Sequence, residues 1–358
     1  MISIAEDRTI VFCVGVGGVG KTTFSAGLAL REALAGRSVL VLTADPARRL
    51  ADALGIDALS DEPSRISLPD GSAGELHAAM LETKASADAI IRRATDDDAR
   101  AKRVLDNKIY QAFSNTLARS HAYAAMERVH QAVHDPQYDL VIVDTPPAQS
   151  ALEILDAPAR LVRFLDQRVV RWFLSPSDDA PRLRGGALTR RLLATIAGDS
   201  LLTALTGFLS EMAFLREGFA ERARDVRDRM RSADTEFVLV ASADAMGVQA
   251  ARSVADEIGR RGFSLGHAVF NRGFIPVSTR TQGTLSSYPA EIEEHAPTLV
   301  EMIAWARAEQ AQRRAAVVEF QDEYAPPVWV LPESMRPLGD ITALSAWIRE
   351  ALPAKALA

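Results

Sequence analysis

The sequence is poor in cysteine, in excess positive charge and in long apolar segments. Its 358 residues include one cysteine, Cys13, which excludes an intrachain disulfide and a paired-cysteine metal clamp and suits a small core residue. The formal net charge of −6 argues against a general basic surface for nucleic acid. No apolar run reaches the roughly 18 residues of a membrane span, and residues 1–8, with Glu6 and Asp7, do not resemble a secretory signal. We therefore expect a cytoplasmic protein with no transmembrane segment and no nucleic-acid partner.

Short apolar runs separated by helical stretches predict the fold. These runs are apolar throughout rather than alternating, which is typical of parallel strands covered by helices on both faces. They lie at residues 9–14, 38–43, 138–144, 236–242, 267–271 and 327–331. The pattern predicts an α/β protein with a doubly wound, mostly parallel sheet of the kind that carries phosphate-binding loops.

Two long regions do not follow this alternation of strands and helices. Residues 74–134 and 152–232 contain no clear strand signal, and apolar residues recur every three or four positions over Leu201–Phe219. We predict that both regions form a helical subdomain inserted beside a nucleotide-binding core. The core then comprises residues 8–73, 135–151 and 233–350.

The segment Gly15–Thr23 matches the phosphate-loop motif G-x-x-x-x-G-K-S/T, and it follows a predicted strand and precedes a predicted helix. Glycines let backbone N–H groups turn toward a polyphosphate, and the helix N-terminus faces the same anion. Lys21 supplies a positive charge for the phosphates, and Thr22 supplies a hydroxyl for Mg²⁺. The motif predicts ATP or ADP binding with Mg²⁺ at Gly17, Gly18, Val19, Gly20, Lys21, Thr22 and Thr23.

Three polar residues that follow buried strands are further candidates. Asp144 ends the run LVIVD and is placed to hold Mg²⁺ directly or through water, unless it only caps a helix or turn. Asp45 follows the run SVLVLT and could bind Mg²⁺ or orient the attacking water, although it could instead cap a helix beginning near Ala47. Asn271 ends the run HAVFN and could read the adenine edge with its amide. Lys21, Asp45 and Asp144 are thus the predicted catalytic residues, and Thr22, Asp45 and Asp144 the predicted metal ligands.

These motifs together resemble the arsenite-pump (anion-transporting) ATPase family, which includes the factors that deliver tail-anchored membrane proteins. The loop GVGGVGKTT is followed by TADPARRLADALG, which is similar to the family's first switch, and DTPPAQSAL at Asp144–Leu152 is similar to the second. The resemblance covers roughly residues 8–350. It implies a dimeric ATPase in which Asn271 binds adenine and Pro332, within LPE, lies in a segment that closes over the base.

The sequence departs from the family pattern at Val16, where the family has a lysine that reaches the partner's nucleotide across the dimer. A charge of this kind, supplied as an arginine finger, contributes roughly 10³–10⁵ in rate. Three possibilities follow: a slow ATPase that acts as a switch, compensation by Arg48 or Arg49, or a heterodimer with a lysine-bearing relative. The two arginines could also be a solvated helix start. Gln149 and Ser150 replace a Gly-His pair of the second switch, and the family's zinc-binding and arsenite-binding cysteines are missing.

The resemblance also implies partners. We expect a homodimer or a heterodimer with a related ATPase, in which hydrolysis moves the switches and the helical subdomain. Apolar stretches at residues 161–174 and 201–219 could line a groove for an apolar helix of a membrane-associated client, or could pack against each other and the sheet. A low-turnover regulatory subunit and the energising subunit of an anion pump remain as alternatives.

Overall fold

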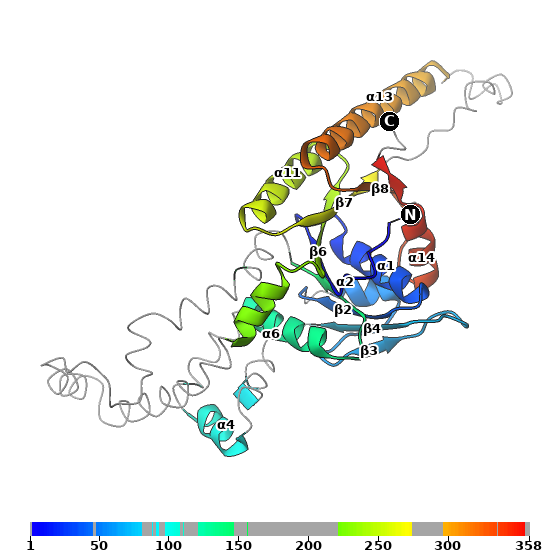
Figure 1. The fold of residues 1–358 in the computed structure, drawn as a ribbon. Coiled ribbons are helices and arrows are strands. Elements are labelled where there is room, and N and C mark those ends of the chain that lie inside the picture. Colours follow the sequence, from blue (N-terminus) through cyan, green and yellow to red (C-terminus); the bar gives the residue numbers. More distant parts are fainter. Residues whose placement is uncertain are drawn as a thin grey trace, which may run out of the picture.

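A nine-stranded sheet forms the centre of the molecule (Figure 1). The computed structural model describes residues 2–45, 48–80, 88, 91–92, 97–107, 110, 121–146, 156, 221–273, 296–334 and 336–354. The strands are β1 (Ile10–Val14), β2 (Ser38–Thr43), β3 (Ser64–Ile66), β4 (Glu75–Met80), β5 (Leu140–Asp144), β6 (Thr235–Ser242), β7 (Leu265–Gly273), β8 (Val328–Pro332) and β9 (Leu352–Pro353). The helices are α1 (Lys21–Leu34), α2 (Arg49–Leu54), α4 (Asp98–Leu105), α6 (His121–His134), α11 (Ala245–Arg260), α13 (Ala296–Tyr324) and α14 (Ile341–Arg349), and residues 221–229 are also helical.

The strand order is β3-β4-β2-β5-β1-β6-β7-β8-β9, and every neighbouring pair from β4 to β8 is parallel. Only the edge strands β3 and β9 run antiparallel to their neighbours. All six predicted strands are present, with ends shifted by one or two residues. The α/β class with a mostly parallel sheet is therefore confirmed.

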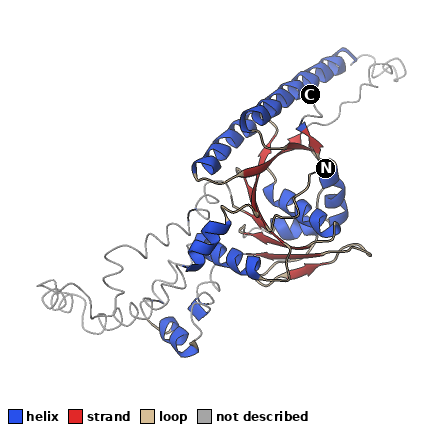
Figure 2. Cartoon of the chain, in the orientation of Figure 1, coloured by secondary structure: helices blue, strands red, loops and turns tan. Residues whose placement is uncertain are grey.

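Helices cover both faces of the sheet, as Figure 2 shows. One face packs its side chains, such as Val11, against α1, α2 and α14, and the other face packs residues such as Phe12 against α6, α11 and α13. Burial on both faces explains why the strand sequences are apolar throughout. Cys13 is buried in the middle of this core, so the prediction of a core cysteine is confirmed. The same burial raises the pKa of its thiol to about 12.

The interpretation of residues 74–134 as free of strands is wrong at Glu75–Met80, which forms β4 beside β2. The sequence ELHAAM contains residues that favour helices, and it becomes a strand because its backbone pairs with β2 on one side and β3 on the other. The described elements in the rest of this region are helices, including α4 and α6. The remaining division into core and helical subdomain stays a prediction, because residues 161–174 and 201–219 lie outside the described residues.

Within the described part of the chain, no helix is both long enough and apolar enough to cross a membrane.

Candidate nucleotide and magnesium site

The predicted site residues come together at the carboxyl edge of the sheet. In parallel strands all carboxyl ends lie at one edge, and this edge is where ligands bind in open α/β sheets. The register pairs Asp144, the last residue of β5, with Cys13 of β1 and with Thr43 of β2. The glycine-rich loop leaves β1 one residue after Val14, so it begins beside Asp144.

The loop has a backbone that only glycines adopt easily. Gly18 and Gly20 have φ angles of 78° and 89°, in the left-handed region. A side chain at Gly15 would place its Cβ 2.0 Å from the carbonyl oxygen of Val240. Gly20 is the N-cap residue of α1, and no side chain caps this helix start. The first N–H groups of α1 therefore face the loop and suit an anion.

The side chain of Lys21 folds back over the loop. It is buried, and its ammonium nitrogen Nζ donates a hydrogen bond of 2.8 Å to the carbonyl oxygen of Val16. Burial lowers the pKa of Lys21, and the neighbouring carboxylate of Asp144 acts in the opposite direction. The charge is thus held at the centre of the loop, where the motif requires it.

Asp144 is the centre of a buried cluster of hydroxyl groups. Its Oδ2 atom accepts hydrogen bonds of 2.8 Å from both Thr22 Oγ1 and Thr43 Oγ1, and Ser25 Oγ lies 3.5 Å from Oδ1. Burial raises the pKa of Asp144 to about 6, against the hydrogen bonds of the two threonines and the charge of Lys21. Asp144 is therefore neither a helix cap nor a turn residue.

The donor set at Asp144 fits Mg²⁺. Mg²⁺ prefers oxygen ligands in octahedral geometry at about 2.0–2.1 Å, which places neighbouring ligand atoms about 2.9 Å apart. The Thr22 hydroxyl and the Asp144 carboxylate offer two such oxygens 2.8 Å apart. A carboxylate with 1% exposure beside a hydroxyl is stabilised by a cation at this position.

Asp45 lies just beyond β2, on the same edge. Its backbone N–H donates to Thr43 Oγ1 at 3.2 Å, and its Oδ2 accepts a hydrogen bond of 3.0 Å from Arg49. Helix α2 begins at Arg49 with Arg48 as its N-cap residue, and residues 46–47, where the alternative placed the start of the helix, lie outside the described residues. The side chain of Arg49 is 67% exposed and is held at the site by Asp45.

Asn271, near the end of β7, packs directly against the phosphate loop. Its Nδ2 donates to the carbonyl oxygen of Val19 at 2.9 Å, and its Oδ1 accepts from the backbone N–H of Arg272 at 2.7 Å. Gly20 approaches so closely that a Cβ there would lie 2.4 Å from Nδ2. In this structure the Asn271 amide therefore supports the loop, and its predicted contact with adenine stays a prediction.

Pro332 ends β8, next to β7, where it pairs with Gly273. Its carbonyl oxygen accepts a hydrogen bond of 3.1 Å from the indole nitrogen of Trp347 on α14. The predicted second-switch residues Gln149 and Ser150 lie outside the described residues.

The sequence reasoning did not identify Thr43 and Ser25, which surround Asp144. Thr43 could have been predicted from the sequence, because it is a polar residue at the carboxyl end of a buried strand, as Asp144 is. Ser25 could not, since it lies one turn into α1 among apolar residues.

Comparisons with known proteins agree with this geometry. The family model described as Anion-transporting ATPase matches residues 8–288. The chain is 25% identical over 268 residues to a Cryptosporidium parvum protein named ATPase ASNA1 homolog, covering 75% of this chain and 66% of the relative. It is 29% identical over 286 residues to an uncharacterized protein of Streptomyces coelicolor, covering 78% and 65%. It is 27% identical over 268 residues to a protein of Aspergillus terreus named ATPase get3, covering 72% and 71%. The matches thus span slightly less than two thirds of the length of the first two relatives.

Proposed function

The chain belongs to the anion-transporting ATPase family, and from this we propose that it binds ATP with Mg²⁺ and hydrolyses it to ADP and phosphate, slowly when alone. The observation that carries the proposal is the cluster of Thr22, Asp144 and Thr43 beside the glycine-rich loop. A glycine turn that served only the fold would not need a buried carboxylate and two hydroxyls at its open edge.

Each residue has a role that follows from its position. The N–H groups of Gly17–Thr23 surround the phosphates, and Lys21 exchanges its bond to Val16 for bonds to the phosphate oxygens. Thr22 and Asp144 hold Mg²⁺, which, when bound, neutralises charge on the transferring phosphoryl group. Asp45 orients the attacking water, and its ion pair with Arg49 holds the carboxylate in place.

The nucleotide state is proposed to control a dimer and its client. Residues Asp45 and Asp144 each lie at the beginning of a predicted switch, so a change in the phosphates acts first on these segments. The client would be an apolar helix of a membrane-associated protein. The dimer would be formed with a second copy or with a related chain.

A second candidate is a regulatory nucleotide-binding subunit with little turnover of its own. It is favoured by Val16, which carries no charge and packs against the apolar cores on both faces of the sheet. In this case a lysine-bearing relative supplies the activating charge. The two candidates share the nucleotide site and differ in the rate of hydrolysis.

Calorimetric titration with Mg²⁺-ATP and Mg²⁺-ADP tests the shared part. The Lys21→Ala variant should bind at least about tenfold more weakly, because a hydrogen bond to a charged group contributes roughly 1.5–3 kcal/mol. Lys102→Ala, which changes an exposed lysine of α4, is the control and should bind as the wild type does. Absence of binding heat for both nucleotides would refute the proposal.

Single-turnover hydrolysis separates the two candidates and tests the arginine. The rate is measured for the chain alone, for the chain with a lysine-bearing relative, and for Arg49→Ala and Arg48→Ala. Slow hydrolysis that Arg49→Ala reduces further supports compensation by the arginine. An unchanged rate in both variants removes that possibility, and hydrolysis only with the relative supports the regulatory subunit.

A further inference from the structure

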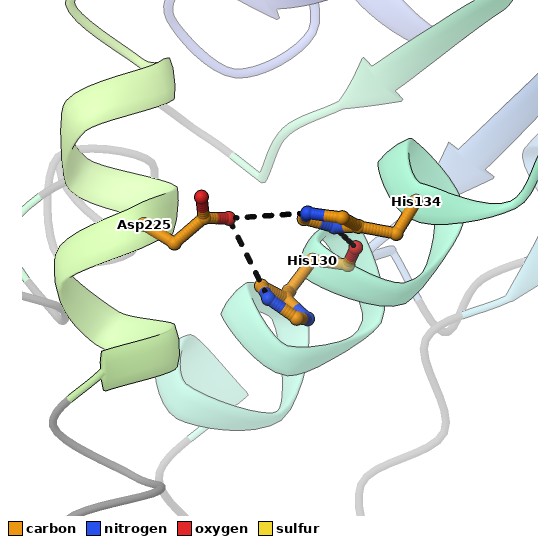
Figure 3. Close-up of side chains that lie close together, drawn as sticks. All are labelled: His130, His134 and Asp225. Carbon is orange, nitrogen blue, oxygen red and sulfur yellow. Dashed lines mark hydrogen bonds and ion pairs between the residues drawn. The ribbon is translucent and has the colours of Figure 1, made fainter.

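Two histidines and an aspartate meet on the other side of the molecule from the nucleotide site. His130 and His134 are four residues apart on α6, so both project from one face of the helix. Asp225 projects toward them from the helical residues 221–229 (Figure 3). The Nε2 atoms of His130 and His134 lie 3.5 and 3.6 Å from Asp225 Oδ2.

These separations match the edges of a tetrahedral metal site. Zinc binds histidine nitrogen at about 2.0–2.1 Å and carboxylate oxygen at about 2.0–2.2 Å, so its ligand atoms lie about 3.3–3.5 Å apart. The three ligand atoms all lie within 4.8 Å of one another. Asp225 Oδ2 is buried and accepts no hydrogen bond within the part of the chain that the structure describes. The atoms are thus spaced for a shared ion rather than for direct hydrogen bonds.

The hydrogen bonds around the cluster favour the tautomer that binds metal. His134 Nδ1 lies 2.7 Å from the carbonyl oxygen of His130, which accepts and therefore requires a proton on Nδ1. The lone pair then resides on Nε2, the atom that faces Asp225. A metal-binding histidine commonly donates its other N–H to a carbonyl in this way.

Arg229 occupies the position of a cation in this structure. Its Nη2 lies 3.3 Å from His134 Nε2, and its Nε lies 3.5 Å from Asp225 Oδ2. The guanidinium therefore lies beside two of the three atoms that a metal would bind. Its side chain is partly exposed, so it can turn into solvent when an ion enters.

We propose that His130, His134 and Asp225 bind a divalent transition metal, best fitted by Zn²⁺, with water at the fourth position. Imidazole nitrogen together with one carboxylate is a ligand set that Zn²⁺ accepts, whereas Mg²⁺ prefers oxygen alone. The 42% exposure of the His134 side chain leaves room for the water. The site therefore differs in chemistry from the one at Asp144.

The position of the cluster gives the ion a structural role. Helix α6 leads into β5 and residues 221–229 lead into β6, so the cluster lies at the amino edge of the sheet. A small cavity beside it is lined by Ile10, the first residue of β1, together with His130, Val226 and Arg229. The ion would join the last helix before β5 to the last helix before β6. Both helices are ends of the predicted helical subdomain.

Calorimetric titration of the full-length protein with Zn²⁺ in excess Mg²⁺ tests the proposal. We expect one Zn²⁺ per chain and an increase in melting temperature, since an ion that binds only the folded chain stabilises it. Asp225→Asn and His134→Ala should weaken binding by more than the roughly 10–100-fold typical for loss of a group that hydrogen-bonds a metal ligand. Arg229→Gln should strengthen binding, because it removes the competing cation.

Asp228→Asn is the matched control, because Asp228 lies one turn further along the same helix and its side chain is 66% exposed. It removes the same charge and should leave Zn²⁺ affinity unchanged. The visible absorption of bound Co²⁺ gives a second readout, which should report tetrahedral coordination in the wild type and in Asp228→Asn. No Zn²⁺ binding by the wild type, or equal binding by Asp225→Asn and Asp228→Asn, would overturn the proposal.

Discussion

Gly20 and Asn271 show how closely single residues are fitted at the phosphate loop. Gly18 and Gly20 both have left-handed φ angles, but their surroundings differ. A Cβ at Gly18 would meet nothing within 4 Å, whereas a Cβ at Gly20 would lie 2.4 Å from Asn271 Nδ2. A substitution at Gly18 therefore measures the cost of the backbone conformation alone, whereas one at Gly20 adds the cost of a clash with Asn271.

We expect Gly18→Ala to lower the free energy of unfolding by about 1–2 kcal/mol, the usual cost of a left-handed residue with a side chain. Gly20→Ala should cost more and should also weaken nucleotide binding, because it displaces Asn271 from Val19. Thermal unfolding and calorimetric titration with Mg²⁺-ADP measure both effects. In the Asn271→Ala background the clash is absent. Adding Gly20→Ala there should therefore lower the free energy of unfolding by no more than Gly18→Ala does in the wild type. A full additive loss would contradict the proposed clash.

At Asp144 the pKa predicts how stability depends on pH. The pKa is about 6 in the folded chain and 3.8 is the ordinary value, so the folded state binds the proton more tightly. The contribution of the protonated carboxyl to stability is therefore complete below about pH 4 and is lost as pH rises to about 6. The difference between a pKa of 3.8 and one of about 6 corresponds to roughly 3 kcal/mol in the free energy of unfolding.

Without Mg²⁺, we expect Asp144→Asn to increase the free energy of unfolding at pH 8 by about 1–3 kcal/mol, because the variant removes a buried charge. At pH 4 the same substitution should have little effect, since Asp144 is then protonated, and this measurement is the internal control. Denaturant unfolding at both pH values checks the prediction. A variant that is less stable than the wild type at pH 8 would show that the ionised carboxylate stabilises the fold.

At the scale of elements, the sequence predicts what burial on both faces of the sheet determines. The six predicted strands have apolar interiors, so their positions and their place in a sheet covered on both faces follow from the sequence, whereas the order of the strands in the sheet does not. Strand β4 is not predictable in this way, because ELHAAM resembles a helix and its pairing with β2 is a tertiary contact.

The candidate site was likewise predictable only where a local sequence pattern marks a residue. The positions of Lys21, Thr22 and Asp144 were predictable, because a motif and the end of a buried strand mark them. The contact between Asn271 and Val19 was not, because it joins segments 252 residues apart through one side-chain hydrogen bond. No local pattern in the sequence encodes such a contact.

Helix α14 connects the C-terminal part of the chain to the predicted adenine side of the site. Its N-cap residue is Asp340, whose side chain accepts a hydrogen bond from the backbone N–H of Ala343, and the helix packs against α1. Its Trp347 donates to the carbonyl oxygen of Pro332 at 3.1 Å. The position of Pro332 therefore depends on this helix.

We expect Trp347→Phe to lower the free energy of unfolding by about 0.5–1.5 kcal/mol, the net contribution of one hydrogen bond. If Pro332 contacts the base, the affinity for ADP should fall more than the affinity for inorganic triphosphate, which has no base. Asp340→Asn, which keeps an N-cap acceptor on the same helix, is the control and should change neither affinity. Equal losses for ADP and triphosphate would argue against a contact between Pro332 and adenine.

At the scale of the whole molecule, the two proposed ion sites lie at opposite edges of one sheet. The phosphate loop follows β1 at Gly15, and the cavity beside the histidines includes Ile10 at the start of the same strand. In the two proposals, the nucleotide site moves the switches at one edge, and the metal site joins the helices that lead into β5 and β6 at the other edge.

Substitutions at Val16 test whether two copies of this chain form the proposed dimer. The half-buried side chain of Val16 packs against the apolar cores on both faces of the sheet. The double variant Val16→Lys/Lys21→Ala carries the lysine but binds its own nucleotide poorly. We expect it to raise the rate at which wild-type protein hydrolyses ATP by at least about tenfold when the two are mixed. A charge supplied across an interface contributes roughly 10³–10⁵ in rate when fully in place. The long stem of a lysine can lie over the apolar surface that Val16 covers, so the substitution is compatible with the fold. Val16→Met/Lys21→Ala, with similar length and no charge, is the control. Equal wild-type rates with the lysine and methionine variants at every mixing ratio would show that two copies of this chain do not bring residue 16 to the partner's nucleotide, and would favour the related lysine-bearing chain as the partner.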